Sequence, residues 1–267
     1  MSFAGIAEIV LQEKVGPEHY MMRVYTPELT RLAKPGQFVH VRCSSTADPL
    51  LRRPISLHGI DYEHGNVSLL YQVVGRGTQL LAEMKTGDEI DIMGPLGRGF
   101  AVPDGINNVL VIGGGIGVAP LFPLVQALKH YKVQQTVLLG ARTADYVMGI
   151  KQLASLGVKV EVATDDGSLG HHGFVTDLAE KYMKLAKPDY FYACGPSPML
   201  KQLLRIAGNY GLDGQVSPEE RMGCGVGACL ACVCKTKTGN GAAGDFEYKK
   251  VCNEGPVFGA SEVIIDG

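Results

Sequence analysis

The chain has 267 residues, 46% of them hydrophobic and 19% charged, with a formal net charge of −2. This length accommodates two compact domains and a small third region, and the balanced charge provides no electrostatic basis for binding nucleic acid. No apolar run reaches the length of a transmembrane helix, so we expect no membrane partner. The lack of an N-terminal targeting segment, together with seven cysteines that suit metal ligation, indicates a cytoplasmic protein.

The first domain, residues 1–102, is predicted to be an antiparallel β-barrel. Short β-prone runs alternate with turns that contain glycine, proline or asparagine. The expected strands span 6–14, 19–26, 37–42, 55–60, 67–74 and 89–93, with one helix at 77–84. Many short strands in so short a segment favour a small closed barrel.

Two motifs in this domain suggest a flavin site. Arg53 lies in an Arg-Arg-Pro-Ile-Ser run, where a guanidinium can bind a diphosphate and the Ser56 hydroxyl can reach the isoalloxazine ring. Gly77-Thr78 stands at an expected helix start, where free amides bind phosphate. Each motif has a structural alternative, which is a solvated arginine pair in the first case and a helix cap by Thr78 in the second. Their occurrence in one barrel favours flavin binding.

The second domain, residues 103–212, changes to an alternation of strand and helix. The expected strands span 108–112, 136–139, 158–163 and 190–194, and the expected helices span 119–130, 144–155, 175–184 and 198–210. Such alternation predicts a doubly wound parallel sheet, an α/β architecture that binds ligands at the carboxyl ends of its strands.

Two loops at these strand ends are candidate nucleotide contacts. The first is a Gly-Gly-Gly-Ile-Gly turn that contains Gly115 and Gly117 and opens a helix, a context that suits a pyrophosphate. Val118 replaces the last glycine of the strict dinucleotide motif, so a tight strand–helix turn is the structural alternative. Cys194 begins the second loop and is either a core thiol or a nicotinamide contact. Arg142, near another strand end, is a candidate contact for the 2′-phosphate of NADPH or a solvated arginine.

The third region, residues 213–267, carries the most specific signal. Cys224, Cys229 and Cys232 have the C-x4-C-x2-C spacing of a plant-type 2Fe–2S cluster, with Cys252 further along the chain. Three glycines interleave the first ligands, which lets their amides point toward cluster sulfurs. A disulfide pair, structural zinc and metal-free thiols are alternatives. Seven is an odd number for disulfides, and zinc sites usually pair two C-x2-C knuckles.

Cys234 competes with Cys252 as the fourth ligand. Cys232 and Cys234 are two residues apart in a probable strand. We expect the two thiols to point to opposite faces of this strand, which favours Cys252 as the fourth ligand.

Taken in chain order, these motifs resemble the ferredoxin–NADP reductase superfamily. The segments that carry the resemblance are Arg53–Ser56, Gly77-Thr78, Gly113–Pro120 and Cys194–Pro196. The C-terminal segments Met222–Cys234, Tyr248–Cys252 and Gly255–Phe258 are similar, more specifically, to electron-transfer subunits of class 1B dihydroorotate dehydrogenases. The resemblance covers nearly the whole chain and implies an FAD barrel, an NAD domain and a 2Fe–2S domain in this order.

The resemblance also implies which residues bind each cofactor. FAD would be bound by Arg53, Pro54, Ile55, Ser56, Leu70, Tyr71, Gln72, Gly77 and Thr78. NAD, as a substrate, would be contacted by Gly115, Gly117 and Cys194, and the cluster would be held by Cys224, Cys229, Cys232 and Cys252. Cys234 matches a position that is not a ligand in the family. No side chain is expected to act as a catalytic acid or base.

The function implied is that of an oxidoreductase subunit in pyrimidine biosynthesis. Electrons would pass between NAD and the FMN of a separate dihydroorotate dehydrogenase catalytic subunit, through FAD and the cluster. The family implies NADH over NADPH and a heterotetramer with two copies of each subunit. The alternatives are a related electron-transfer subunit that serves an NAD(P)H:ferredoxin, sulfide or sulfite oxidoreductase, and a non-catalytic redox sensor.

Overall fold

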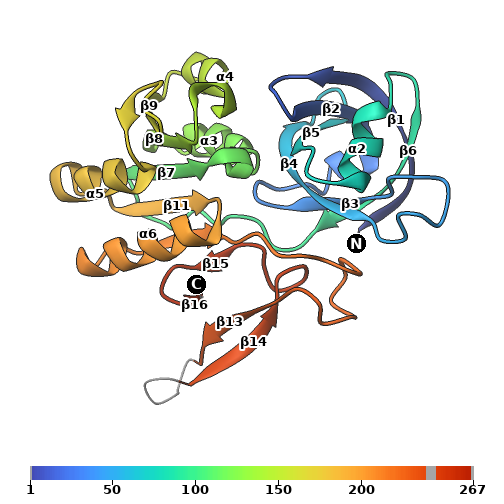
Figure 1. Ribbon diagram of the computed structural model, residues 1–267. Coiled ribbons are helices and arrows are strands. Elements are labelled where there is room, and N and C mark those ends of the chain that lie inside the picture. The colour runs from blue at the N-terminus through green and yellow to red at the C-terminus, as the bar shows by residue number, and fades with distance from the viewer. Residues whose placement is uncertain (1, 239–244, 266–267) are drawn as a thin grey trace.

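The computed structural model describes residues 2–238 and 245–265, which form three parts in chain order (Figure 1). A β-barrel and an α/β unit lie side by side, and the C-terminal part lies below them in this view. The expected multidomain fold class is confirmed.

The first part is a closed six-stranded antiparallel barrel with the strand order β1-β2-β5-β4-β3-β6. Its strands are β1 (Phe3–Lys14), β2 (His19–Tyr25), β3 (Phe38–Val41), β4 (Arg53–Asp61), β5 (Asn66–Gln72) and β6 (Glu89–Leu96). The helices α1 (Pro27–Thr30) and α2 (Arg76–Glu83) lie in its connections. Side chains that alternate along each strand fill the interior, including Val39, Leu57 and Ile92, which are fully buried.

The second part is built on a seven-stranded sheet with the order β10-β9-β8-β7-β11-β12-β15. The strands are β7 (Asn108–Gly114), β8 (Gln134–Ala141), β9 (Lys159–Thr164), β10 (His171–His172), β11 (Tyr190–Cys194), β12 (Gly214–Ser217) and β15 (Phe258–Gly259). All neighbours pair in parallel except β12 and β15. The helical segments are η1 (Gly115–Val118), α3 (Leu121–His130), η2 (Ala144–Tyr146), α4 (Ile150–Ser155), α5 (Val175–Ala186) and α6 (Ser197–Asn209).

The sequence prediction did not include α1, and two expected helices of the α/β unit begin or run differently from the prediction. The helix expected over 144–155 is two short segments, η2 and α4, because Gly149 between them adopts a left-handed φ of +80°. The helix expected from residue 119 begins at Leu121, after the tight turn η1.

The sheet extends beyond residue 212, the domain boundary expected from the sequence. Strand β12 follows that residue, yet it pairs with β11 in the register Cys194↔Ser217. Strand β15 comes from the end of the chain and covers the edge of β12. The C-terminal segment is thus joined to the seven-stranded sheet by main-chain hydrogen bonds.

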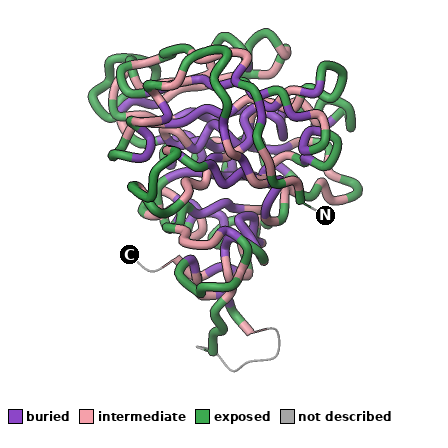
Figure 2. The backbone as a smooth tube through the Cα atoms, turned by 90° about the vertical axis from the view of Figure 1, so that its right-hand side faces the viewer, coloured by how far each residue is buried: buried purple, intermediate pink, exposed green. Residues whose placement is uncertain are grey.

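The third part holds a small antiparallel sheet of β14 (Phe246–Lys250), β13 (Val233–Lys237) and β16 (Val263–Ile264). Its buried residues, including Cys232, Val251 and Cys252, share one apolar core with Phe38 of the barrel and Leu200 of α6. Figure 2 shows that buried backbone continues from the upper parts into this region and gives way to exposed chain toward its tip.

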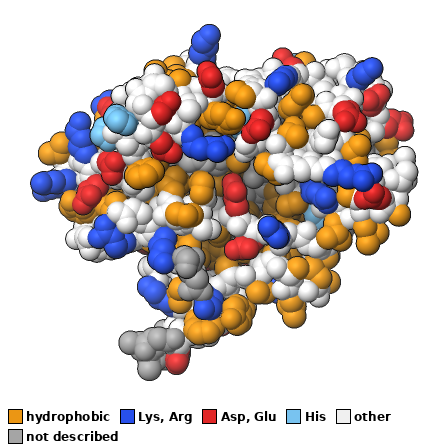
Figure 3. Space-filling model, viewed as in Figure 1, with side chains coloured by type: hydrophobic (Ala, Val, Ile, Leu, Met, Phe, Trp, Pro, Cys, Tyr) orange, Lys and Arg blue, Asp and Glu red, His pale blue; other side chains and the backbone are white. Residues whose placement is uncertain are grey.

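The surface fits the balanced composition. Basic and acidic side chains are intermixed over the face seen in Figure 3. In the part of the chain that the structure describes, no helix has the length and apolar character needed to cross a membrane.

Candidate functional site

A cavity of about 670 Å³ lies where the barrel, the α/β unit and the C-terminal segment meet. Most of the residues expected to bind flavin line it, as do two of those expected to contact NAD. The expected residues that line the cavity are Arg53, Pro54, Ile55, Ser56, Leu70, Tyr71, Gln72, Thr78, Gly117 and Cys194. The structure thus brings together segments that are more than 100 residues apart in the sequence.

The expected flavin contacts on β5 lie on two different faces of the strand. Leu70 and Gln72 lie on the face of β5 toward the α/β unit, where Leu70 packs into that unit's core. Tyr71 lies on the opposite face, and its ring is buried in the barrel core. Its hydroxyl accepts a hydrogen bond from Gln12 Nε2 at 2.9 Å, and burial raises the pKa of Tyr71 to about 12. The phenol of Tyr71 therefore supports the barrel, and Leu70 and Gln72 are the better placed for a cofactor.

Arg53 and Gly77 are in direct contact. A Cβ atom at Gly77 would lie 2.5 Å from Arg53 Nε, so only glycine lets the guanidinium lie across the first turn of α2. Thr78 stabilises the same turn, because its hydroxyl accepts hydrogen bonds from the amides of Val74 at 3.0 Å and Gly75 at 3.3 Å. Gly77 acts by making room for Arg53, and Thr78 acts as the helix cap.

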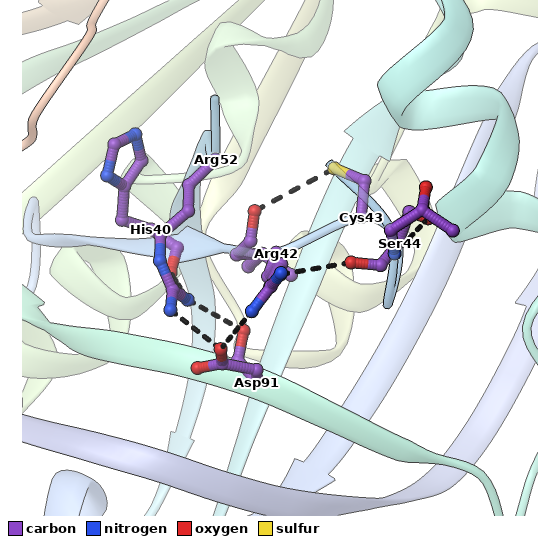
Figure 4. Close-up of polar contacts among 8 residues, drawn as sticks. His40, Arg42, Cys43, Ser44, Arg52 and Asp91 are labelled. Atoms are coloured by element: carbon purple, nitrogen blue, oxygen red, sulfur yellow. Dashed lines mark hydrogen bonds and ion pairs between the residues drawn. The ribbon is translucent and has the colours of Figure 1, made fainter. Parts of the chain in front are cut away.

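The two adjacent arginines have different partners. Arg52 Nη2 donates to Asp91 Oδ2 at 2.7 Å, and Arg42 approaches the same carboxylate at 4.0 Å (Figure 4). Arg53 donates to the main-chain carbonyl of Leu51 and lines the cavity. Arg52 is thus committed to an ion pair, whereas the charge of Arg53 faces the space that a diphosphate would fill.

Several lining residues were not among the expected flavin contacts. The segment 217–222 lines the flavin cavity shortly before the first cluster cysteine, and Ile116, Ala119 and Pro120 approach from the α/β unit. Residues 217–221 lie outside every segment that carries the resemblance, whereas Ile116, Ala119 and Pro120 belong to the glycine-rich segment expected to contact a nucleotide. Their position closes the cavity on two sides.

A second cavity, also of about 670 Å³, lies at the carboxyl ends of the parallel strands. Gly115 lines it in a left-handed conformation, with a φ of +53° and open space where a Cβ would stand. Arg142 and Asp165, from the ends of β8 and β9, line it as well. This is the position at which a doubly wound sheet binds its ligand.

The two cavities meet at Gln72, Ile116 and Glu219, which line both of them. The Glu219 residue is solvent-exposed overall, but the surrounding protein crowds its carboxyl group and raises the pKa. The two cavities therefore adjoin at this junction.

Gly117 has a packing role at the junction. A Cβ atom there would lie 2.3 Å from the carbonyl oxygen of Cys194, so glycine is required for the two strand-end loops to touch. The Cys194 side chain is 4% exposed, and burial raises the pKa of its thiol. Both residues line the flavin cavity, at its boundary with the α/β unit.

Arg142 stacks over the ring of Tyr146, with its guanidinium carbon 5.2 Å from the ring centroid. Tyr146 lines the nucleotide cavity beside it. The arginine is therefore held on the cavity wall by an aromatic contact.

The cysteine loop is preorganised for anionic sulfur. The amides of Val226, Ala228 and Cys229 donate to Cys224 Sγ at 3.4, 3.2 and 3.4 Å. The Gly227 amide donates to Cys252 Sγ at 3.1 Å. Such a nest of amides stabilises thiolates and the sulfides that they accompany.

The electrostatics of these thiols follow from the loop. Burial opposes ionisation of Cys224, but the amide donors outweigh it and lower the pKa of this thiol to about 6. Burial and the neighbouring Cys232 raise the pKa of Cys252 to about 12 in the metal-free chain. The Cys252 amide donates to Cys232 Sγ at 3.4 Å, which places these two cysteines together.

The four cysteines fit a diiron cluster better than the alternatives. All seven cysteines are free thiols, which disfavours the disulfide interpretation. Over residues 2–238 and 245–265, no three His, Cys, Asp or Glu side chains converge on a single ion, as a zinc site requires. A 2Fe–2S cluster takes two thiolates on each iron, so its ligands stand further apart.

Cys234 lies on β13, and its side chain packs against the shared apolar core. Burial, with the negative charges of Glu220 and Glu262, raises the pKa of its thiol to about 11. Cys234 is therefore suited to packing.

The barrel, the nucleotide sheet and the cysteine loop together define a flavin-dependent, nucleotide-linked iron–sulfur reductase. Family models agree, matching an oxidoreductase FAD-binding domain over residues 7–100, an oxidoreductase NAD-binding domain over 111–204 and the iron–sulfur cluster binding domain of dihydroorotate dehydrogenase B over 219–264. The chain belongs to the family of dihydroorotate dehydrogenase B electron transfer subunits.

Relatives from three organisms support this placement. The electron transfer subunit of dihydroorotate dehydrogenase B (NAD(+)) from Desulforamulus reducens is 46% identical over 99% of both chains. The subunits of the same name from Bacillus caldolyticus and Fusobacterium nucleatum are 43% and 39% identical and cover 96% and 95% of this chain, and 97% and 95% of their own lengths. A chain from the structure of an NADH-dependent reduced ferredoxin–NADP oxidoreductase is 32% identical, with a TM-score of 0.85 over 99% of this chain and 92% of that one.

Proposed function

We propose that this chain is the electron transfer subunit of an NAD-dependent dihydroorotate dehydrogenase of the B type. It passes electrons between the FMN of a catalytic subunit and NAD in pyrimidine biosynthesis. The net direction is from dihydroorotate to NAD⁺. FAD and a 2Fe–2S cluster are its cofactors.

One observation carries the proposal. The segment 217–222 lines the flavin cavity, and Cys224 follows it two residues later. The flavin cavity meets the nucleotide cavity at Gln72, Ile116 and Glu219. This adjacency of nucleotide cavity, flavin cavity and cysteine loop supports electron transfer between a nucleotide and a cluster through a flavin.

In this proposal the chain's own residues bind and orient the cofactors and the nucleotide. Arg53 neutralises a diphosphate at the first turn of α2, Leu70 and Gln72 form the wall between the cavities, and Gly115 lets the backbone approach a nucleotide. A bound flavin exchanges two electrons with a nicotinamide and single electrons with an iron–sulfur cluster. Cys224, Cys229, Cys232 and Cys252 hold that cluster, with the Val226, Ala228 and Gly227 amides directed at its thiolates.

The partner is a separate flavoprotein, with which the chain forms a heterotetramer of two copies of each subunit in the cytoplasm. The relatives' names imply a catalytic subunit, because each is called an electron transfer subunit. Cys229 and Leu230 are exposed on the cysteine loop, so the cluster site is open to a partner.

Purification of the chain with its native partner tests the proposal. We expect a complex that contains both FAD and FMN and that reduces NAD⁺ with dihydroorotate. The complex should also contain as much sulfide as iron, as a 2Fe–2S cluster requires. A complex that lacks FMN, or that reduces ferredoxin but does not oxidise dihydroorotate, would contradict this partner and support a related ferredoxin, sulfide or sulfite oxidoreductase.

A further inference from the structure

His40 is a buried histidine with no assigned task. Its side chain is 1% exposed, yet neither Nδ1 nor Nε2 has a hydrogen-bond partner of ordinary geometry within residues 2–238 and 245–265. Burying an unsatisfied polar group destabilises a protein, and such groups are rare in native structures. An apolar side chain would fill the same space without this cost, so the imidazole calls for an explanation beyond packing.

The alternation of β3 directs this ring out of the barrel. Val39 and Val41 belong to the barrel core, so Phe38 and His40 lie on the outer face. Phe38 is buried there with Cys232 and Cys252 of the third part. The outer face of β3 is thus the surface on which the flavin barrel meets the cluster domain.

The ring lies directly against the cysteine loop. A Cβ atom at Gly225 would stand 2.5 Å from His40 Nδ1, and Gly225 adopts a φ of +73°. The main-chain carbonyl of the neighbouring Cys224 faces the ring and can accept a hydrogen bond from it. Figure 4 shows the imidazole pointing away from the ion pair of Arg52 and Asp91.

The same residue is connected to the flavin cavity through its backbone. His40 pairs with Pro54 in the ladder of β3 and β4, and Pro54 lines the cavity. Arg52, which also lines the cavity, donates to the His40 carbonyl at 3.5 Å. His40 therefore contacts the flavin-cavity strand through its backbone and the cysteine loop through its side chain.

The ring can act as a donor, because an imidazole carries at least one N–H group in either protonation state.

We propose that His40 is a positioning residue for the iron–sulfur cluster. Its ring N–H donates into the loop at Cys224 and holds this ligand's loop against the flavin barrel. Hydrogen bonds around cluster sulfurs influence the reduction potential, and residues behind metal ligands typically affect activity about 10- to 100-fold. The inference rests on the proposed function in taking Cys224 as a cluster ligand, but it needs no particular electron partner.

The test compares His40→Leu and His40→Asn with His64→Leu, which removes an exposed histidine from the same barrel. Each variant is purified as the full chain, and the cluster's EPR spectrum and midpoint potential are measured in the absence of a catalytic partner. We expect His40→Leu to shift the spectrum, lower the potential and slow electron transfer from flavin to cluster by about 10-fold or more. His40→Asn, which keeps a donor, should restore part of each property, and His64→Leu should match the wild type.

A measurement on the wild-type chain covers the case in which both variants lose the cluster. Pulsed EPR of the reduced cluster in protein with isotopically labelled histidine should detect a weakly coupled imidazole nitrogen. The inference fails if this coupling is absent, or if His40→Leu retains the wild-type spectrum and potential. Because these readouts do not involve dihydroorotate, they stay valid if the proposed partner is wrong.

Discussion

Gly117→Ala tests the junction between the two cavities. The added Cβ would lie 2.3 Å from the carbonyl oxygen and 2.6 Å from the carbonyl carbon of Cys194. Both are backbone atoms, so a rotamer change cannot relieve the clash and the two strand-end loops must separate. Overpacking of this kind costs about 1–3 kcal/mol. At roughly 2–4 °C per kcal/mol for a chain of this size, the thermal midpoint of the protein should fall by roughly 2–12 °C.

The same displacement should impair reaction with NADH. Gly117 and Cys194 line the flavin cavity next to the nucleotide cavity, and a misplacement of about 1 Å can reduce a rate by about 100-fold. NADH-dependent dye reduction and differential scanning calorimetry give the two readouts.

Gly208→Ala is the matched control. Gly208 lies in α6, and a Cβ atom there meets nothing within 4 Å. Alanine is the better helix former, so this variant should be equally or more stable, by up to about 1 kcal/mol. If Gly117→Ala melted within about 1 °C of the wild type and reacted normally with NADH, the packing argument for this junction would be refuted.

Three further predictions concern flavin, cluster and stability. Arg53→Ala should weaken FAD binding roughly 10- to 150-fold, because a charged hydrogen-bond partner contributes about 1.5–3 kcal/mol; flavin retained after dialysis measures it. Cys252→Ser should lose the visible 2Fe–2S absorption and bound iron, whereas Cys234→Ser should keep both. Asp189 accepts two main-chain amide hydrogen bonds, which hold the pKa of its carboxyl below the ordinary value of 3.8. A depressed pKa stabilises the fold above the ordinary value, and this contribution is lost as pH falls through the folded pKa. Asp189→Asn should therefore lower the thermal midpoint at neutral pH, with a difference from wild type that narrows in acid.

Each of these predictions has an outcome that would contradict it. The exposed Arg23→Ala variant in the same barrel should retain FAD, and equal losses in both arginine variants would count against a specific role for Arg53. Cluster loss in Cys234→Ser, with retention in Cys252→Ser, would reverse the ligand assignment. A thermal difference for Asp189→Asn that stays constant from neutral to acid pH would show that its carboxyl is not the stabilising group.

The fold was predictable because its signals are local. Strand alternation, turn residues and the change of rhythm near residue 103 mark the barrel and the α/β unit. The expected helix across 144–155 was wrong, because Gly149 interrupts it. The pairing of β12 with β11 was missed, since a short strand gains its partner only in the folded sheet.

The candidate site also combines features with a local sequence signal and contacts that form only between distant segments. The spacing of Cys224, Cys229 and Cys232 is a signal within a single loop, so sequence reasoning could find it. The expected separation of Cys232 and Cys234 onto opposite strand faces was wrong, because residues two apart in a strand share a face and Cys232 precedes β13. The placement of Cys252 Sγ beside the Gly227 amide supports Cys252 more directly. His40 lies on a strand that is distant in sequence from the loop it contacts, and no pattern in the sequence predicted that contact.

The central claim is that electrons cross this chain from the flavin of a partner to a nucleotide site, by way of its cluster and its own flavin. Dihydroorotate-dependent NAD⁺ reduction by the reconstituted complex tests it most directly, with the wild-type chain compared with Cys224→Ser. The account predicts that Cys224→Ser loses this activity but retains FAD and NADH-dependent dye reduction. A Cys224→Ser complex that reduces NAD⁺ at the wild-type rate would contradict the account.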